Sequence, residues 1–182
     1  MSNNALIVVD LQKDYYQGGK WTLEGTEKAS ANAKRILEAT RKAGDLVVHV
    51  RHEFPNEAAP FFVPGSEGAS IHPDVVPAEG EPVLTKDQVN SFKGTELKKV
   101  LDKSGIEAVT IVGAMSHMCI DAVTRAASDH GYKCTLVHDA CATLDLEFNG
   151  VTVPAHMVHA AFMSALGFAY AEVISTEELL AR

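Results

Sequence analysis

Several features of membrane and nucleic-acid-binding proteins are missing from this sequence. No apolar run approaches the roughly 20 residues that a membrane-spanning helix needs. The opening MSNNALIVVD carries no basic segment and reaches an aspartate too early for an export signal. Lys and Arg total 16 against 24 Asp and Glu, giving a formal net charge of −8, and the basic residues form no cluster. We therefore expect no membrane and no nucleic-acid partner.

Cysteine is also scarce. Three cysteines in 182 residues, an odd number, indicate free thiols in a reducing cytoplasm rather than a disulfide framework. The sequence has no internal repeat or low-complexity segment, and 46% of its residues are hydrophobic. A chain of this length can bury a core without disulfides or metals. We therefore predict one domain over residues 1–182, located in the cytoplasm.

Short apolar runs alternate with segments of helical periodicity along the chain. This alternation predicts an α/β fold, with a parallel sheet covered by helices on both faces. Thr26 is expected to cap the first helix, and Ser175 with Glu178 to form a capping box before the last helical turn. The expected strands are 5–9, 46–50, 82–86, 109–112, 133–137 and 171–174, the expected helices begin near 26, 95, 120 and 154, and the expected loops are 12–25, 54–82 and 142–153.

One stretch, residues 109–131, has the pattern that presents a nucleophile. A β-branched strand ends at Gly113, and helical spacing runs from Ile120 to Gly131, with Cys119 at the join. Unpaired N–H groups and the positive end of a helix dipole at such a position favour a thiolate. The competing interpretation is a buried, inert Cys119, because free cysteine is commonly a core residue.

Two further reactive side chains fall at predicted strand ends, Asp10 after the first strand and Lys86 at the end of the third. Ligands of parallel sheets bind at the carboxyl ends of the strands, so Asp10, Lys86 and Cys119 are expected to meet there. A thiol that attacks a carbonyl needs a base, which Asp10 can provide, and Lys86 would offset the negative charge. Backbone N–H groups of the turn 113–119 would form an oxyanion hole. The alternative is an Asp–Lys ion pair beside a core cysteine.

Three motifs carry a resemblance to a known family: VVDLQKDY, VLTKDQVNSF and VGAMSHMCIDAVTRAA. In this order, and together with HDACAT and VHAAFMSAL, they resemble the isochorismatase-like cysteine hydrolases over nearly the whole chain. The resemblance implies a Rossmann-like three-layer sandwich with a six-stranded parallel sheet, and a catalytic triad of Asp10, Lys86 and Cys119. It also implies a cis peptide between Ala114 and Met115, with the N–H groups of Met115 and Cys119 as the oxyanion hole. A homo-oligomer is implied too, for which the apolar segment 54–76 is a natural interface.

Departures from the family pattern narrow the expected chemistry. Related nicotinamidases carry an Asp-x-His metal motif where this chain reads Arg51–His52–Glu53–Phe54, so we predict no metal and no cofactor. Isochorismatases that cleave a vinyl ether lack the nucleophilic cysteine, so Cys119 favours hydrolysis of a C–N bond through a thioester. The cysteine hydrolase subgroup that includes streptothricin lactam hydrolases is most similar. The expected substrate is a small amide, lactam or ureido compound.

Other candidates compete for a place in the site. Cys141, at a strand end, is the rival nucleophile, whereas Cys134 inside a strand is expected in the core. The i, i+3 pair His156 and His159 could suit a metal, but nothing nearby completes a tetrahedral set. The remaining candidates are His52 facing the site, His49 packed or partnered, His117 touching substrate from the turn, and Tyr16, Trp21 and Phe92 as pocket walls.

Two functions other than hydrolysis fit the same residues. One is a family member that binds a small carbonyl compound or senses oxidants through Cys119. The other is a plain doubly wound binding module, in which Cys119 would react with iodoacetamide no faster than Cys134.

Overall fold

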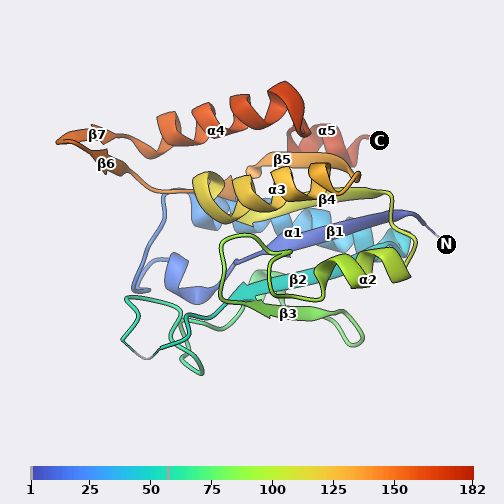
Figure 1. Cartoon of the computed structure of the whole chain (residues 1–182), viewed down its shortest axis with the longest axis horizontal. Coiled ribbons are helices and arrows are strands. Elements are labelled where there is room, and N and C mark those ends of the chain that lie inside the picture. The colour runs from blue at the N-terminus through green and yellow to red at the C-terminus, as the bar shows by residue number, and fades with distance from the viewer. Residues whose placement is uncertain (1, 57) are drawn as a thin grey trace.

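A six-stranded parallel sheet forms the centre of the computed structural model, which describes residues 2–56 and 58–182 (Figure 1). The strands lie in the order β3-β2-β1-β4-β5-β8, and every neighbouring pair is parallel. The predicted α/β sandwich is therefore confirmed. The strands are β1 (Asn4–Val9), β2 (Leu46–His52), β3 (Val83–Lys86), β4 (Ala108–Ala114), β5 (Lys133–Ala142) and β8 (Glu172–Ile174).

Helices cover both faces of this sheet (Figure 1). On one face, α1 (Thr26–Ala43) and α5 (Thr176–Leu180) pack against β1, β4 and β5 through a core that includes Ile36 and Leu37. On the other face, α2 (Leu97–Lys103), α3 (Asp121–Asp129) and α4 (Ala155–Ala169) share a core that includes Leu101, Val123 and Leu166. None of the described helices is long and apolar enough to cross a membrane.

The expected loop 142–153 is wrong in part, because it contains an antiparallel hairpin. Strands β6 (Leu146–Phe148) and β7 (Val151–Val153) flank Asn149 and Gly150, which both have positive φ. An Asn-Gly pair between short strands is the signature of a two-residue hairpin turn, so the sequence carried the signal. Strand β5 also runs five residues past its expected end, which places Cys141 inside the strand opposite Gly113.

One of the two predicted helix caps is present. Ser175 and Glu178 form the complete capping box at α5, as predicted. Thr26 does not cap α1, because Gly25, with φ of 73°, occupies the N-cap position. The Thr26 hydroxyl is buried and donates instead to the carbonyl oxygens of Tyr15 and Leu23, which ties the loop before α1 to the helix.

The long excursion 54–82 packs against its own domain. Phe61, Phe62 and Val75, the last in the short 3-10 turn Pro73–Val75, are buried, so most of this segment does not offer the apolar interface expected from the sequence. Large exposed apolar side chains instead include Phe148 of the β6–β7 hairpin and Phe168 of α4. The hairpin protrudes from the sheet (Figure 1). The homo-oligomer itself stays a prediction.

Candidate active site

The carboxyl edge of the sheet brings together Asp10, Lys86 and Cys119, the three residues expected to meet there. Asp10 follows β1, Lys86 ends β3, and Cys119 lies in the turn between β4 and α3. The Lys86 Nζ is 2.7 Å from Asp10 Oδ2 and donates to Cys119 Sγ across 3.3 Å. All three side chains are buried, with Asp10 fully inaccessible. The ammonium thus contacts both the carboxylate and the thiol, and all three groups are shielded from water.

Local backbone geometry places these groups. Asp10 has a φ of 51°, the left-handed conformation that Asp tolerates better than most residues, and this turns the chain at the strand end. Gly113, with φ of 133°, lies so close to β1 that a Cβ there would overlap the Val9 carbonyl oxygen. A single π-helical turn, Ser116–Ile120, then carries Cys119 into α3. The peptide between Ala114 and Met115 is cis, as the family resemblance implies.

A fourth residue, His52, joins the three. The β2–β3 register pairs His52 with Lys86, and the Lys86 Nζ lies 2.9 Å from His52 Nδ1. An ammonium has three N–H donors and no lone pair, so Nδ1 acts as an acceptor in this contact. Burial, followed by the charge of Lys86, lowers the pKa of His52 to about 4. His52 is therefore neutral at pH 7, and the candidate that the sequence placed near the site does face it.

The negative charge of Asp10 raises the pKa of both the thiol and the ammonium. Burial and then the nearby Asp10 carboxylate raise the pKa of Cys119, against the lowering effect of Lys86. Burial alone would lower the pKa of Lys86, but the charge of Asp10, and that of the Cys119 sulfur whenever it is ionised, outweigh burial and raise that pKa. The resting pair is a protonated thiol beside a charged lysine. Burial and the carboxylate thus oppose the thiolate that a helix terminus alone would favour.

Two buried polar residues of the loop after β1, neither of them predicted from the sequence as a site residue, hold backbone segments beside the site in place. Gln12 accepts from the His52 backbone N–H at 2.7 Å and donates to the His52 carbonyl at 2.8 Å. Asp14, in the 3-10 turn Lys13–Tyr15, accepts from the Phe62 backbone N–H at 2.7 Å. Polar residues that directly follow a buried strand were the available signal.

Aromatic side chains gather beside the site. Trp21 stacks on Phe61 with ring centroids 4.8 Å apart, and Phe61 contacts Phe54, whose ring lies edge-on to His52 at 4.5 Å. A pocket of about 330 Å³ has Phe54 and Lys86 among its lining residues, although Asp10, His52 and Cys119 do not line it. This volume is at the small end of ligand pockets. The Trp21 ring is partly exposed and belongs to this aromatic group.

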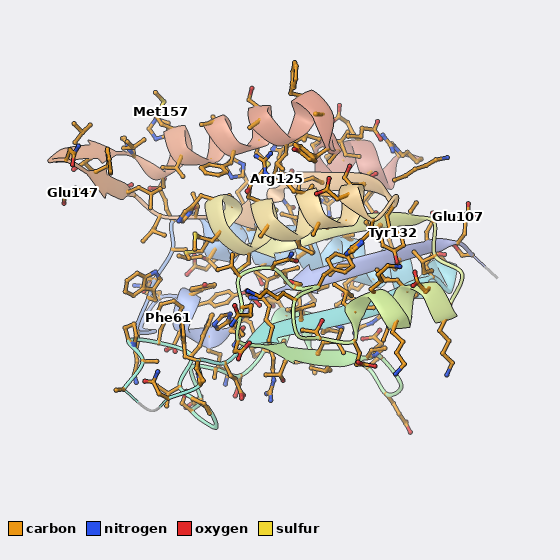
Figure 2. The ribbon with its side chains drawn as sticks, in the orientation of Figure 1. Phe61, Glu107, Arg125, Tyr132, Glu147 and Met157 are labelled. Carbon is orange, nitrogen blue, oxygen red and sulfur yellow. The ribbon has the colours of Figure 1, made fainter. Side chains whose placement is uncertain are left out.

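The other predicted pocket residues lie in different surroundings. Tyr16 is buried and stacks on His72 at 3.7 Å. Phe92 packs on His130 and Tyr132, which follow the far end of α3 from Cys119; Figure 2 shows Tyr132 far from Phe61. The structure therefore does not bring Phe92 to the triad.

His117 lies in the turn that carries Cys119. Its Nδ1 is 2.6 Å from Thr143 Oγ1, and burial lowers its pKa. This contact fastens the turn to the segment that follows β5.

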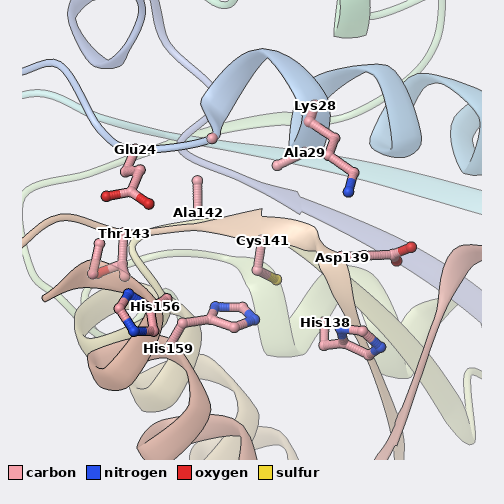
Figure 3. A pocket seen from close by; sticks show the side chains of 12 residues that line it. Glu24, Lys28, Ala29, His138, Asp139, Cys141, Ala142, Thr143, His156 and His159 are labelled. Carbon is pink, nitrogen blue, oxygen red and sulfur yellow. The ribbon is translucent and has the colours of Figure 1, made fainter.

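The hydrogen bonds of the rival cysteines within the described structure all go to backbone carbonyl oxygens. Cys134 is a core residue, as expected, and burial raises its pKa to about 11. Cys141 lines a separate pocket of about 410 Å³, shown with His156 and His159 in Figure 3. Its thiol donates to the Val137 carbonyl at 3.4 Å, and burial raises its pKa to about 12. Among the described residues, neither thiol forms a hydrogen bond with a charged side chain, whereas the Cys119 sulfur accepts from Lys86.

One group of three candidate metal ligands occurs among the described residues, and it is the site itself. Asp10, His52 and Cys119 each place one donor atom within 4.8 Å of the other two. The ammonium of Lys86 contacts all three donor residues. A divalent cation there would meet this fixed positive charge, so the residues present do not fit a metal. His159 is not free for a metal through Nδ1, which lies 2.8 Å from Ser116 Oγ.

Known proteins resemble this chain over most of its length. The isochorismatase domain family model matches residues 4–178. YddQ, an uncharacterised isochorismatase family protein of Bacillus subtilis, is 46% identical over 97% of this chain and 98% of its own. A streptothricin hydrolase of Streptomyces noursei is 34% identical over 90% of this chain and 59% of its own. A crystal structure from Oleispira antarctica, assigned to the isochorismatase hydrolases, superposes with a TM-score of 0.96 at 59% identity, over 100% of this chain and 98% of that one.

Proposed function

Because the chain belongs to the isochorismatase family, we propose that it hydrolyses a C–N bond of a small amide, lactam or ureido compound without a metal. Cys119 is the nucleophile, Asp10 the general base and then acid, and Lys86 their electrostatic partner. The observation that carries the proposal is the contact of the Lys86 ammonium with both the Asp10 carboxylate and the Cys119 sulfur. A relative named as a streptothricin hydrolase supports hydrolytic chemistry in this family.

Acylation begins with transfer of the Cys119 proton to Asp10. The sulfur then bonds to the substrate carbonyl carbon, and the carbonyl electron pair moves onto oxygen. The N–H groups of Met115 and Cys119 stabilise this oxyanion, by roughly 3–4 kcal/mol per donor. As the C–N bond breaks, protonated Asp10 returns the proton to nitrogen, and ammonia or an amine leaves. A thioester on Cys119 remains.

Deacylation repeats these steps with water as the nucleophile. Asp10 takes a proton from water, whose oxygen bonds to the thioester carbon. The C–S bond then breaks, and Asp10 returns the proton to sulfur, which restores the resting thiol. Beyond its ion pair with Lys86, the Asp10 carboxylate accepts no hydrogen bond from the described residues, so lone pairs stay available for both transfers.

Burial of the triad supports this division of roles. A resting thiol next to a carboxylate resists adventitious oxidation, because the thiolate is the reactive form. Substrate that displaces water brings its carbonyl against the sulfur, and Lys86 then offsets the charge that moves between Asp10 and Cys119.

Intact-protein mass spectrometry tests the proposal directly. The protein is incubated with a panel of small amides, lactams and ureido compounds beside Cys119→Ser, and released ammonia or amine is measured. We expect the wild-type protein to gain the mass of the acyl group transiently. Cys119→Ser should show no thioester adduct. Cys141→Ser is the matched control and should retain turnover.

Full turnover by Cys119→Ser would contradict the proposal. A Cys119 that is modified only by oxidants and restored only by a reductant would favour the redox-sensing alternative instead.

A further inference from the structure

The unused atom of the site is His52 Nε2. It is buried and has no hydrogen-bond partner among the described residues, although the His52 side chain touches the catalytic lysine through Nδ1. A buried polar atom without a partner costs free energy unless a ligand or water satisfies it. Nε2 is therefore a candidate hydrogen-bonding group for a bound molecule.

The proton on His52 can be placed from its neighbours. Three acceptor atoms surround the Lys86 ammonium, from Asp10 at 2.7 Å, His52 at 2.9 Å and Cys119 at 3.3 Å. An ammonium only donates, so Nδ1 carries no proton, and a neutral ring must then carry its proton on Nε2. Nε2 is thus a hydrogen-bond donor, fixed by Lys86.

The ring has little freedom to turn away. Gln12 holds the His52 backbone on both its N–H and its carbonyl, and Phe54 and Phe62 pack beside the imidazole. One ring nitrogen lies within 4.8 Å of the Cys119 sulfur. The donor is therefore fixed on a ring that lies beside the reactive thiol and packs against aromatic side chains.

We propose that His52 is a substrate-contacting residue, which orients Lys86 through Nδ1 and donates from Nε2–H to an oxygen or nitrogen acceptor of the bound molecule. The expected ligand is a small carbonyl compound that carries a hydrogen-bond acceptor close to its reacting carbon. The identity of that compound as a hydrolysed amide rests on the proposed function. The donor itself does not.

Nitrogen NMR of protein labelled at histidine tests the tautomer without any substrate. The His52 signals are identified by their loss in His52→Gln. We expect Nδ1 unprotonated and Nε2 protonated at pH 6, where a histidine of ordinary pKa would be largely charged. A charged ring at pH 6, or a proton on Nδ1, would overturn the proposal.

A tethered carbonyl tests the acceptor. In Cys134→Ala/Cys141→Ala protein, iodoacetamide alkylates Cys119: its sulfur displaces iodide and gains a carboxamidomethyl group. Methyl methanethiolsulfonate instead leaves a methylthio group, with loss of methanesulfinate and no carbonyl. We expect the His52 Nε2–H proton to move downfield, and to exchange with water more slowly, only in the carboxamidomethyl protein. Equal behaviour of the two adducts would overturn the proposal.

Two partial mimics of histidine separate its two contacts. His52→Asn keeps an acceptor for Lys86 but loses the distant donor, whereas His52→Gln can reach the donor position. We expect the rate of Cys119 modification by iodoacetamide, divided by its rate with the thiolsulfonate, to fall roughly three- to tenfold in His52→Asn and less in His52→Gln. His49→Gln, the matched change on the same strand, should leave the ratio unchanged.

These results and the hydrolysis screen can fail separately. A correct tautomer and adduct response with no amide turned over would leave His52 as a ligand donor and remove the proposed function. Amide turnover by a protein with the proton on Nδ1 would support the proposed function and remove the role of His52 as a donor.

Discussion

The Lys86 ammonium donates to the Cys119 sulfur across 3.3 Å, in a place where neither group reaches solvent freely. In water this contact would contribute little to the electrostatic energy of the site. Burial lowers the local dielectric constant, so the contact and the neighbouring charges interact more strongly. Burial raises the pKa of Cys119 most, and beyond burial that pKa depends on the balance between Asp10, which raises it, and Lys86, which lowers it. Replacing Asp10 should therefore lower the pKa of the Cys119 thiol, and replacing Lys86 should raise it.

Asp10→Asn should separate thiol reactivity from catalysis. Loss of the carboxylate removes a charge that raises the pKa of Cys119, while Lys86 stays, so more thiolate forms at a given pH. We expect alkylation by iodoacetamide at pH 8 to become roughly tenfold faster, for one unit of pKa. Amide turnover should fall at least about a hundredfold, because the leaving nitrogen loses its proton donor.

The measurement is the alkylation rate of each cysteine by peptide mass spectrometry, run beside the turnover assay. Cys134 in the same protein is the internal control and should keep its rate. Slower alkylation of Cys119 in Asp10→Asn would contradict this account of the charges.

Lys86→Ala should convert the site into a metal site. The donor atoms of Asp10, His52 and Cys119 lie within 4.8 Å of one another, close to the spacing around an ion with bonds of roughly 2.0–2.3 Å. Without the ammonium, we expect Co²⁺ to bind with a sulfur-to-cobalt charge-transfer absorption, which the wild-type protein should lack. The double variant Lys86→Ala/Cys119→Ser should lose this absorption. The same absorption in the wild-type protein would contradict the role of Lys86 as the built-in cation.

Gly113→Ala should destabilise the fold where β4 packs against β1 beneath the site. A Cβ at this position would overlap the Val9 carbonyl oxygen, and the φ of 133° is unfavourable for any other residue. We expect a loss of more than about 3 kcal/mol in the free energy of unfolding, which denaturant titration measures. Gly131→Ala, at a positive φ but with open space around the Cβ, is the control for backbone strain alone and should cost less.

Much of the fold and the triad could be predicted because both follow from order along the chain. Parallel strands bring their carboxyl ends to one edge, so Asp10, Lys86 and Cys119 had to converge once the strands were located. His52 was harder, since its contact with Lys86 depends on the register between β2 and β3, which no local pattern fixes. The pocket walls depend on how residues 54–82 fold back, and Asp14 holds that segment by accepting from the Phe62 N–H and donating its own N–H to the Gly68 carbonyl.

Glu81→Gln should reveal an acid-sensitive contribution to stability outside the site. Glu81 accepts from Arg41 at 2.7 Å through both carboxylate oxygens, and from the Ala78 backbone N–H at 2.8 Å, and it lies 2.9 Å from His49 Nε2. Arg41 first, with Ala78 and His49, lowers the pKa of Glu81 to about 2, against the opposing effect of burial. We expect the substitution to cost about 2 kcal/mol at pH 7, from lost hydrogen bonds to a charged group.

The sign of the pH dependence follows from that pKa. A carboxyl group whose folded pKa is below its ordinary value of 4.5 stabilises the fold above pH 4.5 and loses this effect as pH falls toward about 2. The difference in free energy of unfolding between wild type and Glu81→Gln should therefore be constant from pH 5 to 7 and shrink below pH 4.5. Urea titrations at each pH measure it, with Glu79→Gln as the control from the same loop. A difference that grows as pH falls would contradict the assigned ion pair, because a glutamine cannot gain stability by protonation.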